Sequence, residues 1–182
     1  NGDAILKIRQ MMLQTLLSPE QKARDTAAQC IGAVAAIDLP CKQWTGQQGI
    51  VAMILQCVTA TQGVPEESKE AALKACGFMC EELEADNLNE DERNQILTAI
   101  VDGIKAGRPD NTRVAAVEAL INSLDFCAEN FNRATERNML MQVVCEASQS
   151  QDVRVRKKAY ECLGCIVELY YDHLSQECKL QI

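Results

Sequence analysis

Apolar side chains recur every three or four positions along most of the chain, which is the spacing of one face of an α-helix. Three clear stripes are Ile5, Ile8, Met11, Met12 and Leu16, then Ile50, Met53, Ile54, Cys57 and Val58, then Ile96, Leu97, Ile100, Val101 and Ile104. No segment of useful length alternates apolar and polar residues with the period of two that a half-buried strand needs. The pattern predicts an all-α protein.

Short connectors rich in polar residues, glycine or proline separate the stripes, such as "SPEQ" (18–21), "QGVPEES" (62–68) and "AGRPDN" (106–111). Such residues begin and end helices, so about eight helices are predicted, over about 3–17, 20–37, 44–60, 66–84, 91–106, 110–127, 133–148 and 152–171. A ninth is expected to begin near His173. Ser18 is expected to cap the second helix, with Pro19 at its first helical position.

A short pattern recurs in the second helix of each successive pair. The strings "AAQCIG" (27–32), "ALKACG" (72–77), "AVEALI" (116–121) and "AYECLG" (159–164) align without gaps, and their leading alanines are 45, 44 and 43 residues apart. This period is typical of HEAT and armadillo solenoids. The sequence therefore predicts a HEAT-repeat solenoid, a right-handed superhelix of about four helix pairs at about 1–39, 40–87, 88–129 and 130–172, with a further repeat starting at 173–182.

Glycine ends three of the four aligned strings, at Gly32, Gly77 and Gly164. Glycine inside a helix costs about 1 kcal/mol relative to alanine, so this position is expected to lie where two helices approach closely. Because no helix pair can bury its apolar face alone, the two ends of the array are expected to expose apolar side chains. The candidates are Ile5 and Ile8 at one end, and Leu180 and Ile182 at the other.

The chain has ten cysteines, including one C-x-x-C pair at Cys162 and Cys165. A structural zinc site takes four ligands, yet there is no second C-x-x-C and His173 is the only histidine. Cys162 occupies the aligned position that Cys30 fills in the first string and that alanine fills in the next two. We therefore expect free thiols that are mostly buried, no metal, and a reducing compartment.

The net charge of −8 comes from one stretch, 66–92, which holds ten acidic residues against two lysines. Nucleic acid is not expected as a partner, because binding it requires a basic surface. Two interpretations remain: a surface that attracts a basic protein, or a solvated helix face. No apolar run is long enough for a membrane span, and the start of the chain lacks the apolar core of a secretion signal.

Catalytic chemistry is not expected either. A Ser–His–Asp or Cys–His site would have to use His173, and no Gly-rich phosphate loop follows a strand. The sequence predicts a protein that is not an enzyme and has no cofactor.

The segments "NQILTAIVDGI" (94–104), "NFNRATERNMLMQVVCEA" (130–147) and "DVRVRKKAYECL" (152–163) resemble the importin-β (karyopherin-β) family of nuclear transport receptors. The segment "AAQCIGAVAAIDLPCKQW" (27–44), with Pro40 and Trp44, resembles the same family. The resemblance covers the whole chain. It implies an N-terminal HEAT-repeat fragment, about the third to sixth repeats of a receptor several times longer.

The resemblance also implies partners and a location. The family binds phenylalanine-glycine nucleoporins and Ran-GTP, and carries cargo directly or through importin-α, between cytoplasm and nucleus and through the nuclear pore. Only part of the Ran surface is expected here, and no residues are assigned to it. The importin-α surface belongs to later repeats, so this segment should reach importin-α or cargo only through the full-length parent.

The family's nucleoporin pocket lies between two neighbouring outer helices, here 91–106 and 133–148. Transferred residue by residue, it comprises Leu97, Thr98, Val101, Glu136, Met139 and Leu140. Met139 departs from the family, in which an aromatic residue is common at this position. Since methionine is flexible and packs well against rings, a reshaped pocket is expected, not a lost one.

Two other classes of protein share the repeat period. One is a general HEAT scaffold, such as a regulatory subunit of a phosphatase or kinase. The other is an armadillo cargo adaptor, which uses Trp-x-x-x-Asn pairs on inner helices. Trp44 argues against the adaptor, because Gln48 follows it at that spacing and it is expected to open an outer helix.

Overall fold

The computed structural model describes residues 2–180, except for the side chains of residues 85 and 172–180. Its α-helices are α1 (Gly2–Thr15), α2 (Gln21–Asp38), α3 (Ile50–Thr59), α4 (Glu66–Glu82), α5 (Glu90–Ile104), α6 (Asp110–Ser123), α7 (Ala128–Asn132), α8 (Ala134–Ala147) and α9 (Val153–Leu180). Short 3-10 turns lie at Gly46–Gln48, Ala85–Asn87 and Leu124–Cys127. No strand occurs within 2–180, so the all-α prediction is confirmed.

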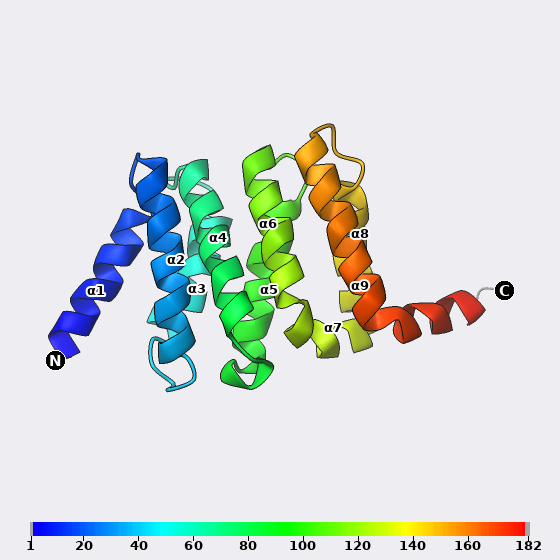
Figure 1. Ribbon diagram of the computed structural model, residues 1–182, viewed down its shortest axis with the longest axis horizontal. Helices are drawn as coiled ribbons and strands as arrows, with labels where there is room; N and C mark the ends of the chain where they lie inside the picture. The colour runs from blue at the N-terminus through cyan, green and yellow to red at the C-terminus, as the bar shows by residue number, and fades with distance from the viewer. Residues whose placement is uncertain (1, 181–182) are drawn as a thin grey trace.

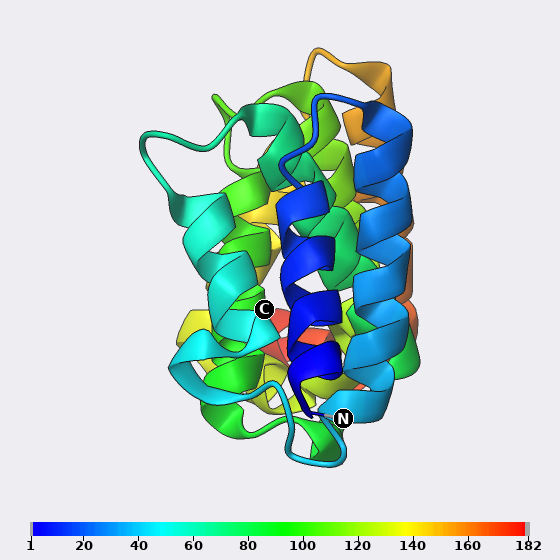
Figure 2. The same cartoon turned by 90° about the vertical axis from the view of Figure 1, so that its left-hand side faces the viewer.

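The helices stack side by side in a linear array, from α1 at one end to α9 at the other (Figure 1). They form two rows, which Figure 2 shows along the stack. We call α2, α4, α6 and the first part of α9 the inner row, and α1, α3, α5 and α8 the outer row. Within the inner row α4 packs extensively on both α2 and α6, whereas α5 and α8 of the outer row touch much less. The core is a continuous layer between the rows.

Small residues allow the inner helices to approach closely. A Cβ atom added to Gly32 in α2 would lie 2.6 Å from the Cβ of Phe78 in α4, and one added to Gly77 would lie 3.4 Å from the Cα of Ala119 in α6. The expected packing role of the repeated glycine is therefore confirmed at Gly32 and is weaker at Gly77. At Gly164 an added Cβ would meet nothing within 4 Å, so no close contact explains that glycine.

A second position of the repeat carries a basic residue. Three residues before each leading alanine stands a basic side chain, at Arg24, Lys69, Arg113 and Arg156. Arg24 Nη1 donates to the carbonyls of Ser18 and Pro19 at 2.8 and 2.9 Å. Arg113 is buried and donates to the Ile104 carbonyl and to Ser150 Oγ. These bonds fix the connectors between helices. Without them the connector carbonyls would lack hydrogen-bond partners.

The expected cap at Ser18 is wrong. The N-cap of α2 is Glu20, without a side-chain bond to the helix. Ser18 Oγ instead accepts from the Glu20 N–H at 3.2 Å, which stabilises the connector and not the first helical turn.

The predicted helix at 44–60 begins only at Ile50, so the expectation that Trp44 opens an outer helix is also wrong. Lys42 and Trp44 both have φ of 56°, a left-handed conformation that interrupts a helix. Contacts with α1 stabilise this loop. Arg9 donates to Asp38 at 2.6 and 2.9 Å and lies over the Trp44 ring, 5.4 Å from its centroid.

The predicted helix at 110–127 also ends early, at Ser123, and a 3-10 turn and the short helix α7 follow. The cause is an aromatic contact between distant parts of the chain. Phe131 of α7 is fully buried and stacks on Tyr170 with a centroid separation of 4.1 Å. The Tyr170 hydroxyl donates to the Leu124 carbonyl, which ties the turn to α9.

At the first end of the array Ile5 and Ile8 are exposed, as expected. Leu180 and Ile182 lie outside the described side chains, as does His173. No separate helix begins at His173. α9 continues to Leu180, with non-helical backbone angles at Tyr170 marking a kink. None of the helices in the described part of the chain is long and apolar enough to span a bilayer.

The repeated glycines provide a matched test of the inner-row packing. Gly32→Ala is expected to lower the free energy of unfolding by about 1–3 kcal/mol, because the new methyl group overlaps Phe78. Gly164→Ala, at the same position of a later repeat, is expected to raise it by about 0.5–1 kcal/mol through helix propensity alone. Denaturant unfolding followed by circular dichroism measures both. Equal effects of the two substitutions would contradict the close approach at Gly32.

Candidate functional site

A groove of about 630 Å³ runs between α5 and α8 on the outer row, and we call it the α5–α8 groove. All six residues expected from the family resemblance line it: Leu97, Thr98, Val101, Glu136, Met139 and Leu140. The other lining residues are Thr59, Asn94, Asp102, Lys105, Asn130, Gln142, Val143 and Glu146. The structure thus brings together, from two helices about 40 residues apart, every side chain of the predicted site.

The floor of the groove is apolar because α5 carries apolar residues on the side toward α8 as well as on its most deeply buried face. Ile96 and Ile100 are buried against the inner row, which leaves Leu97 and Val101 on the side that faces α8. Leu97 is only 6% exposed and Val101 is half-buried. The floor is therefore firmly packed, and Val101 is more accessible to a ligand than Leu97.

On α8 three successive apolar residues divide in the same way. Leu140 is 4% exposed and Met141 is half-buried, while Met139 is 54% exposed. Successive residues of a helix point about 100° apart, so the three cannot share one face. Leu140 forms part of the floor, and Met139 reaches up beside it from the rim.

Charged groups at both ends of the groove are held by bonds within the protein. At one end Glu136 accepts from Asn130 Nδ2 at 2.5 Å and from Arg133 Nη1 at 3.1 Å. At the other end Asp102 pairs with Lys105 and with Arg108. Burial opposes the charged form of Asp102, but the hydrogen bonds from the two cations outweigh it and lower the pKa of this carboxyl group. Both carboxylates are thus positioned before any ligand arrives.

The sequence did not indicate the other eight lining residues, and Val143 and Asn130 illustrate why. Val143 lies one helical turn beyond Met139 and Leu140, so helical spacing could have found it. Asn130 could not have been found, because it belongs to α7, a helix that the periodicity did not indicate.

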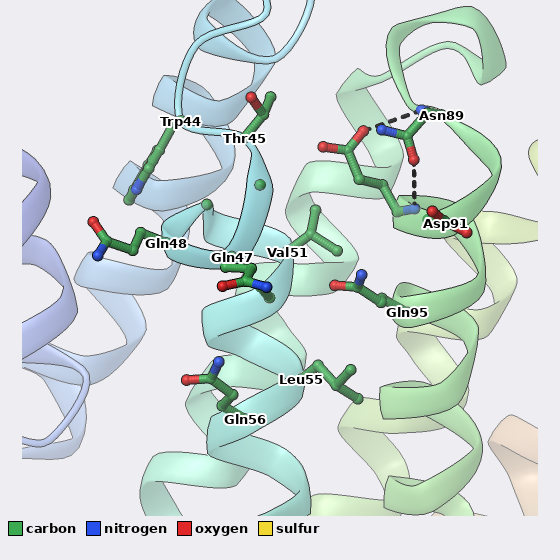
Figure 3. Close-up of a pocket in the computed structure, with 14 residues that line it drawn as sticks. Trp44, Thr45, Gln47, Gln48, Val51, Leu55, Gln56, Asn89, Asp91 and Gln95 are labelled. Carbon is green, nitrogen blue, oxygen red and sulfur yellow. Dashed lines mark hydrogen bonds between the residues drawn. The ribbon is translucent and has the colours of Figure 1, made fainter.

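A second groove, of about 610 Å³, lies one repeat earlier between α3 and α5. Figure 3 shows that glutamine side chains surround it, with Gln47, Gln56 and Gln95 among them. The start of α5 at its edge is already capped: Asn89 and Glu92 exchange hydrogen bonds at 2.9 and 3.0 Å. This groove is more polar than the α5–α8 groove, so it is less suited to burying an apolar side chain.

The cysteines correct one expectation. Of the nine whose side chains are described, four are buried (Cys76, Cys80, Cys127 and Cys162), two are intermediate (Cys57 and Cys165), and three are exposed (Cys30, Cys41 and Cys145). The expectation that the thiols are mostly buried is therefore wrong. Cys30 fills the same repeat position as Cys162, but it faces the open space beside α1.

The buried thiols are poor nucleophiles. Burial raises the pKa of Cys127 and that of Cys162 to about 12 in each case. Because the thiolate is the reactive form, these residues stay protonated at neutral pH. Among the described residues no cluster of histidine, cysteine or acidic side chains could hold a metal ion.

Comparison with known proteins identifies the chain's relatives. No family model matches it. Importin subunit beta-1 of Arabidopsis thaliana is 39% identical over 170 residues, covering 93% of this chain and 19% of the relative. Importin subunit beta-1 of Schizosaccharomyces pombe is 40% identical over 167 residues, which cover 91% of this chain and 19% of the relative. The structure of yeast importin-β (Kap95p) superposes on all of the chain and 21% of its own length, with a TM-score of 0.88 and 35% identity.

The chain is homologous to importin subunit beta-1. The HEAT-repeat solenoid is thereby confirmed, and the chain spans about a fifth of the length of the curated importin-β relatives that it matches.

Two further importin-β structures carry information on partners. One describes Kap95p binding that induces the switch loops of RanGDP to adopt the GTP-bound conformation (TM-score 0.86, 37% identity, 94% of this chain and 19% of that chain). The other is a Kap95:Nup1 complex (TM-score 0.86, 36% identity, 98% of this chain and 20% of that chain).

The burial of the thiols generates a prediction. At pH 8 Cys30, Cys41 and Cys145 are expected to react rapidly with a water-soluble thiol reagent in the native protein. Cys127 and Cys162 are expected to react at least about ten-fold more slowly until denaturant is added, because they are protonated and inaccessible. Site-resolved mass spectrometry over time measures this. Modification of Cys162 as fast as that of Cys145 would contradict the packing described here.

Proposed function

We propose that the chain is a segment of a nucleocytoplasmic protein import receptor and that its α5–α8 groove binds phenylalanine-glycine segments of nucleoporins. The observation that carries the proposal is an open groove between two outer helices with an apolar floor, formed by Leu97 and Leu140 at the edge of the core together with Val101. Homology to importin subunit beta-1 and the similarity to Kap95 in its complex with Nup1 support it.

The chemistry of the ligand fits this groove. Phenylalanine-glycine repeats are disordered chains in which the phenyl ring is the main large apolar group, so their receptor needs shallow apolar slots at its surface. The floor formed by Leu97, Val101 and Leu140 offers such a slot. A groove of about 630 Å³ is also large enough for a ring and its neighbouring residues.

The rim supplies polar contacts for the rest of the ligand. Next to a phenylalanine, glycine leaves the main chain uncovered, so its N–H groups can donate to a nearby carboxylate. Glu136 lies at the rim, and Asn130 and Arg133 already fix its side chain. A charge held in place loses little conformational freedom when the peptide binds.

We further infer that the chain contributes part of a Ran-GTP surface. The similarity to Kap95p with RanGDP supports this inference. Among the acidic residues of 66–92, Glu67, Glu81, Glu82, Glu84, Asp86 and Asp91 are exposed, and none has an ion-pair partner within the described part of the chain. This negative surface suits a basic protein partner. Importin-α and cargo would be reached through the full-length receptor, which we place in the cytoplasm, the nucleus and the nuclear pore, with no catalytic role.

A general HEAT scaffold remains the alternative. It predicts that the chain binds neither a phenylalanine-glycine peptide nor Ran-GTP when each is titrated separately. The import-receptor hypothesis predicts that the peptide binds at the α5–α8 groove.

Val101→Asp tests the groove directly. The substitution places a charge where the phenyl ring must dock, so it is expected to weaken binding of a phenylalanine-glycine peptide at least several-fold, about 1 kcal/mol or more. Fluorescence anisotropy measures the affinity, and circular dichroism checks the fold. Thr98→Asp, at an exposed rim position, is also expected to weaken binding, without disturbing the core.

The matched control is Ile37→Asp on α2, since Ile37 is 70% exposed and does not line the groove. This variant is expected to bind like the parent chain. Folded Val101→Asp and Thr98→Asp variants that both retain full affinity would rule out the α5–α8 groove as the binding site.

A further inference from the structure

We propose that Met139 is a peroxide-sensitive site and that its oxidation to the sulfoxide lowers the affinity of the α5–α8 groove for phenylalanine side chains. This inference rests on the proposed function, because it concerns how binding at the same groove is regulated.

Exposure distinguishes Met139 from most other methionines of the chain. Met12 and Met79 are buried, and Met53 and Met141 are half-buried. Only two described methionines are exposed: Met139, at 54%, and Met11, at 65%. Met11 lies on α1 at the first end of the array, far from the α5–α8 groove. An oxidant in solution therefore reaches one methionine that lines the groove and one that does not.

Met139 is also the side chain whose chemistry the groove depends on most. No aromatic residue lines this groove among the described residues, and Leu97 and Leu140 are almost covered. The thioether of Met139 is therefore the most accessible apolar group for an incoming ring. Sulfur–aromatic contacts are favourable, and the three rotatable bonds of methionine let it adjust to the ring.

The chemical step is a two-electron oxidation by a peroxide. A lone pair of the Met139 sulfur attacks one peroxide oxygen and the O–O bond breaks. An S=O bond forms, and hydrogen peroxide is reduced to water. Methionine sulfoxide reductases, which draw their electrons from thiols, reverse the change.

The product no longer suits the groove. Sulfoxide formation turns a flexible apolar side chain into a polar one, whose S=O oxygen must lose bound water if a phenyl ring covers it. Asn130 Nδ2 cannot serve this oxygen as a donor, because Asn94 and Glu136 already accept both of its N–H groups. The carboxylates of Glu136 and Glu146 also line the groove, and they disfavour another partial negative charge.

The experiment compares peptide affinity before and after a limited hydrogen peroxide treatment, with sulfoxide at each methionine quantified by mass spectrometry. Three chains are used: the parent, Met139→Leu and Met11→Leu. Leucine keeps an apolar side chain of similar size but cannot form a sulfoxide. For each chain the measured quantity is the ratio of the two dissociation constants. Cys145 is exposed on the same helix, so every sample is treated with dithiothreitol after oxidation to reverse disulfides and sulfenic acids.

Oxidation is expected to weaken binding at least about three-fold in the parent and in Met11→Leu, and to leave Met139→Leu nearly unchanged. Methionine sulfoxide reductases are expected to restore the parent. An equal loss in Met139→Leu, or no loss in a parent chain oxidised at Met139, would overturn the inference while leaving the proposed function intact. Absence of peptide binding by the unoxidised parent would instead overturn the proposed function, and this inference with it.

Discussion

The close approach of α2, α4 and α6 is the constraint on which the rest of the structure depends. Each helix pair has too little apolar surface to form a core alone, so neighbouring pairs must pack tightly. Gly32 and the alanines of the repeated strings make this possible on the inner row, where α4 contacts α2 and α6 extensively. α5 and α8 contact each other much less. A tightly packed α2–α4–α6 row, with little contact between α5 and α8, leaves the α5–α8 groove at the surface.

This arrangement separates folding from binding. Ile96 and Ile100 pack toward the inner row, so they stabilise α5 whatever lies in the groove. Val101 is half-buried and packs against the edge of the core, and Met139 is exposed. The side chain of Met139 can therefore change with little cost to the stack. The same separation makes the groove sensitive to modification without loss of the fold.

Much of this architecture could be predicted from the sequence, because its causes are local or repeated. Helical periodicity placed α4 and α5 within two residues of their observed bounds, and the repeated strings located the inner row. The six groove residues came from the family resemblance, since periodicity alone cannot tell an open groove from ordinary packing between repeats.

The failures have tertiary causes. The loop before α3 depends on Arg9 and Trp44, and α7 depends on the stacking of Phe131 on Tyr170, contacts between residues far apart in the sequence. A repeat position indicates which face a residue occupies. It cannot indicate whether another helix covers that face, so the exposure of Cys30 was missed.

Methyl-resolved NMR during titration with a phenylalanine-glycine peptide tests the central claim most directly, because a bound phenyl ring shifts the signals of methyl groups beneath it. The account predicts large shifts for Leu97, Val101 and Leu140, and small ones for Val51 and Leu55, which line the second groove, between α3 and α5. Shifts confined to Val51 and Leu55, or none at Leu97, Val101 and Leu140 under saturating peptide, would contradict it.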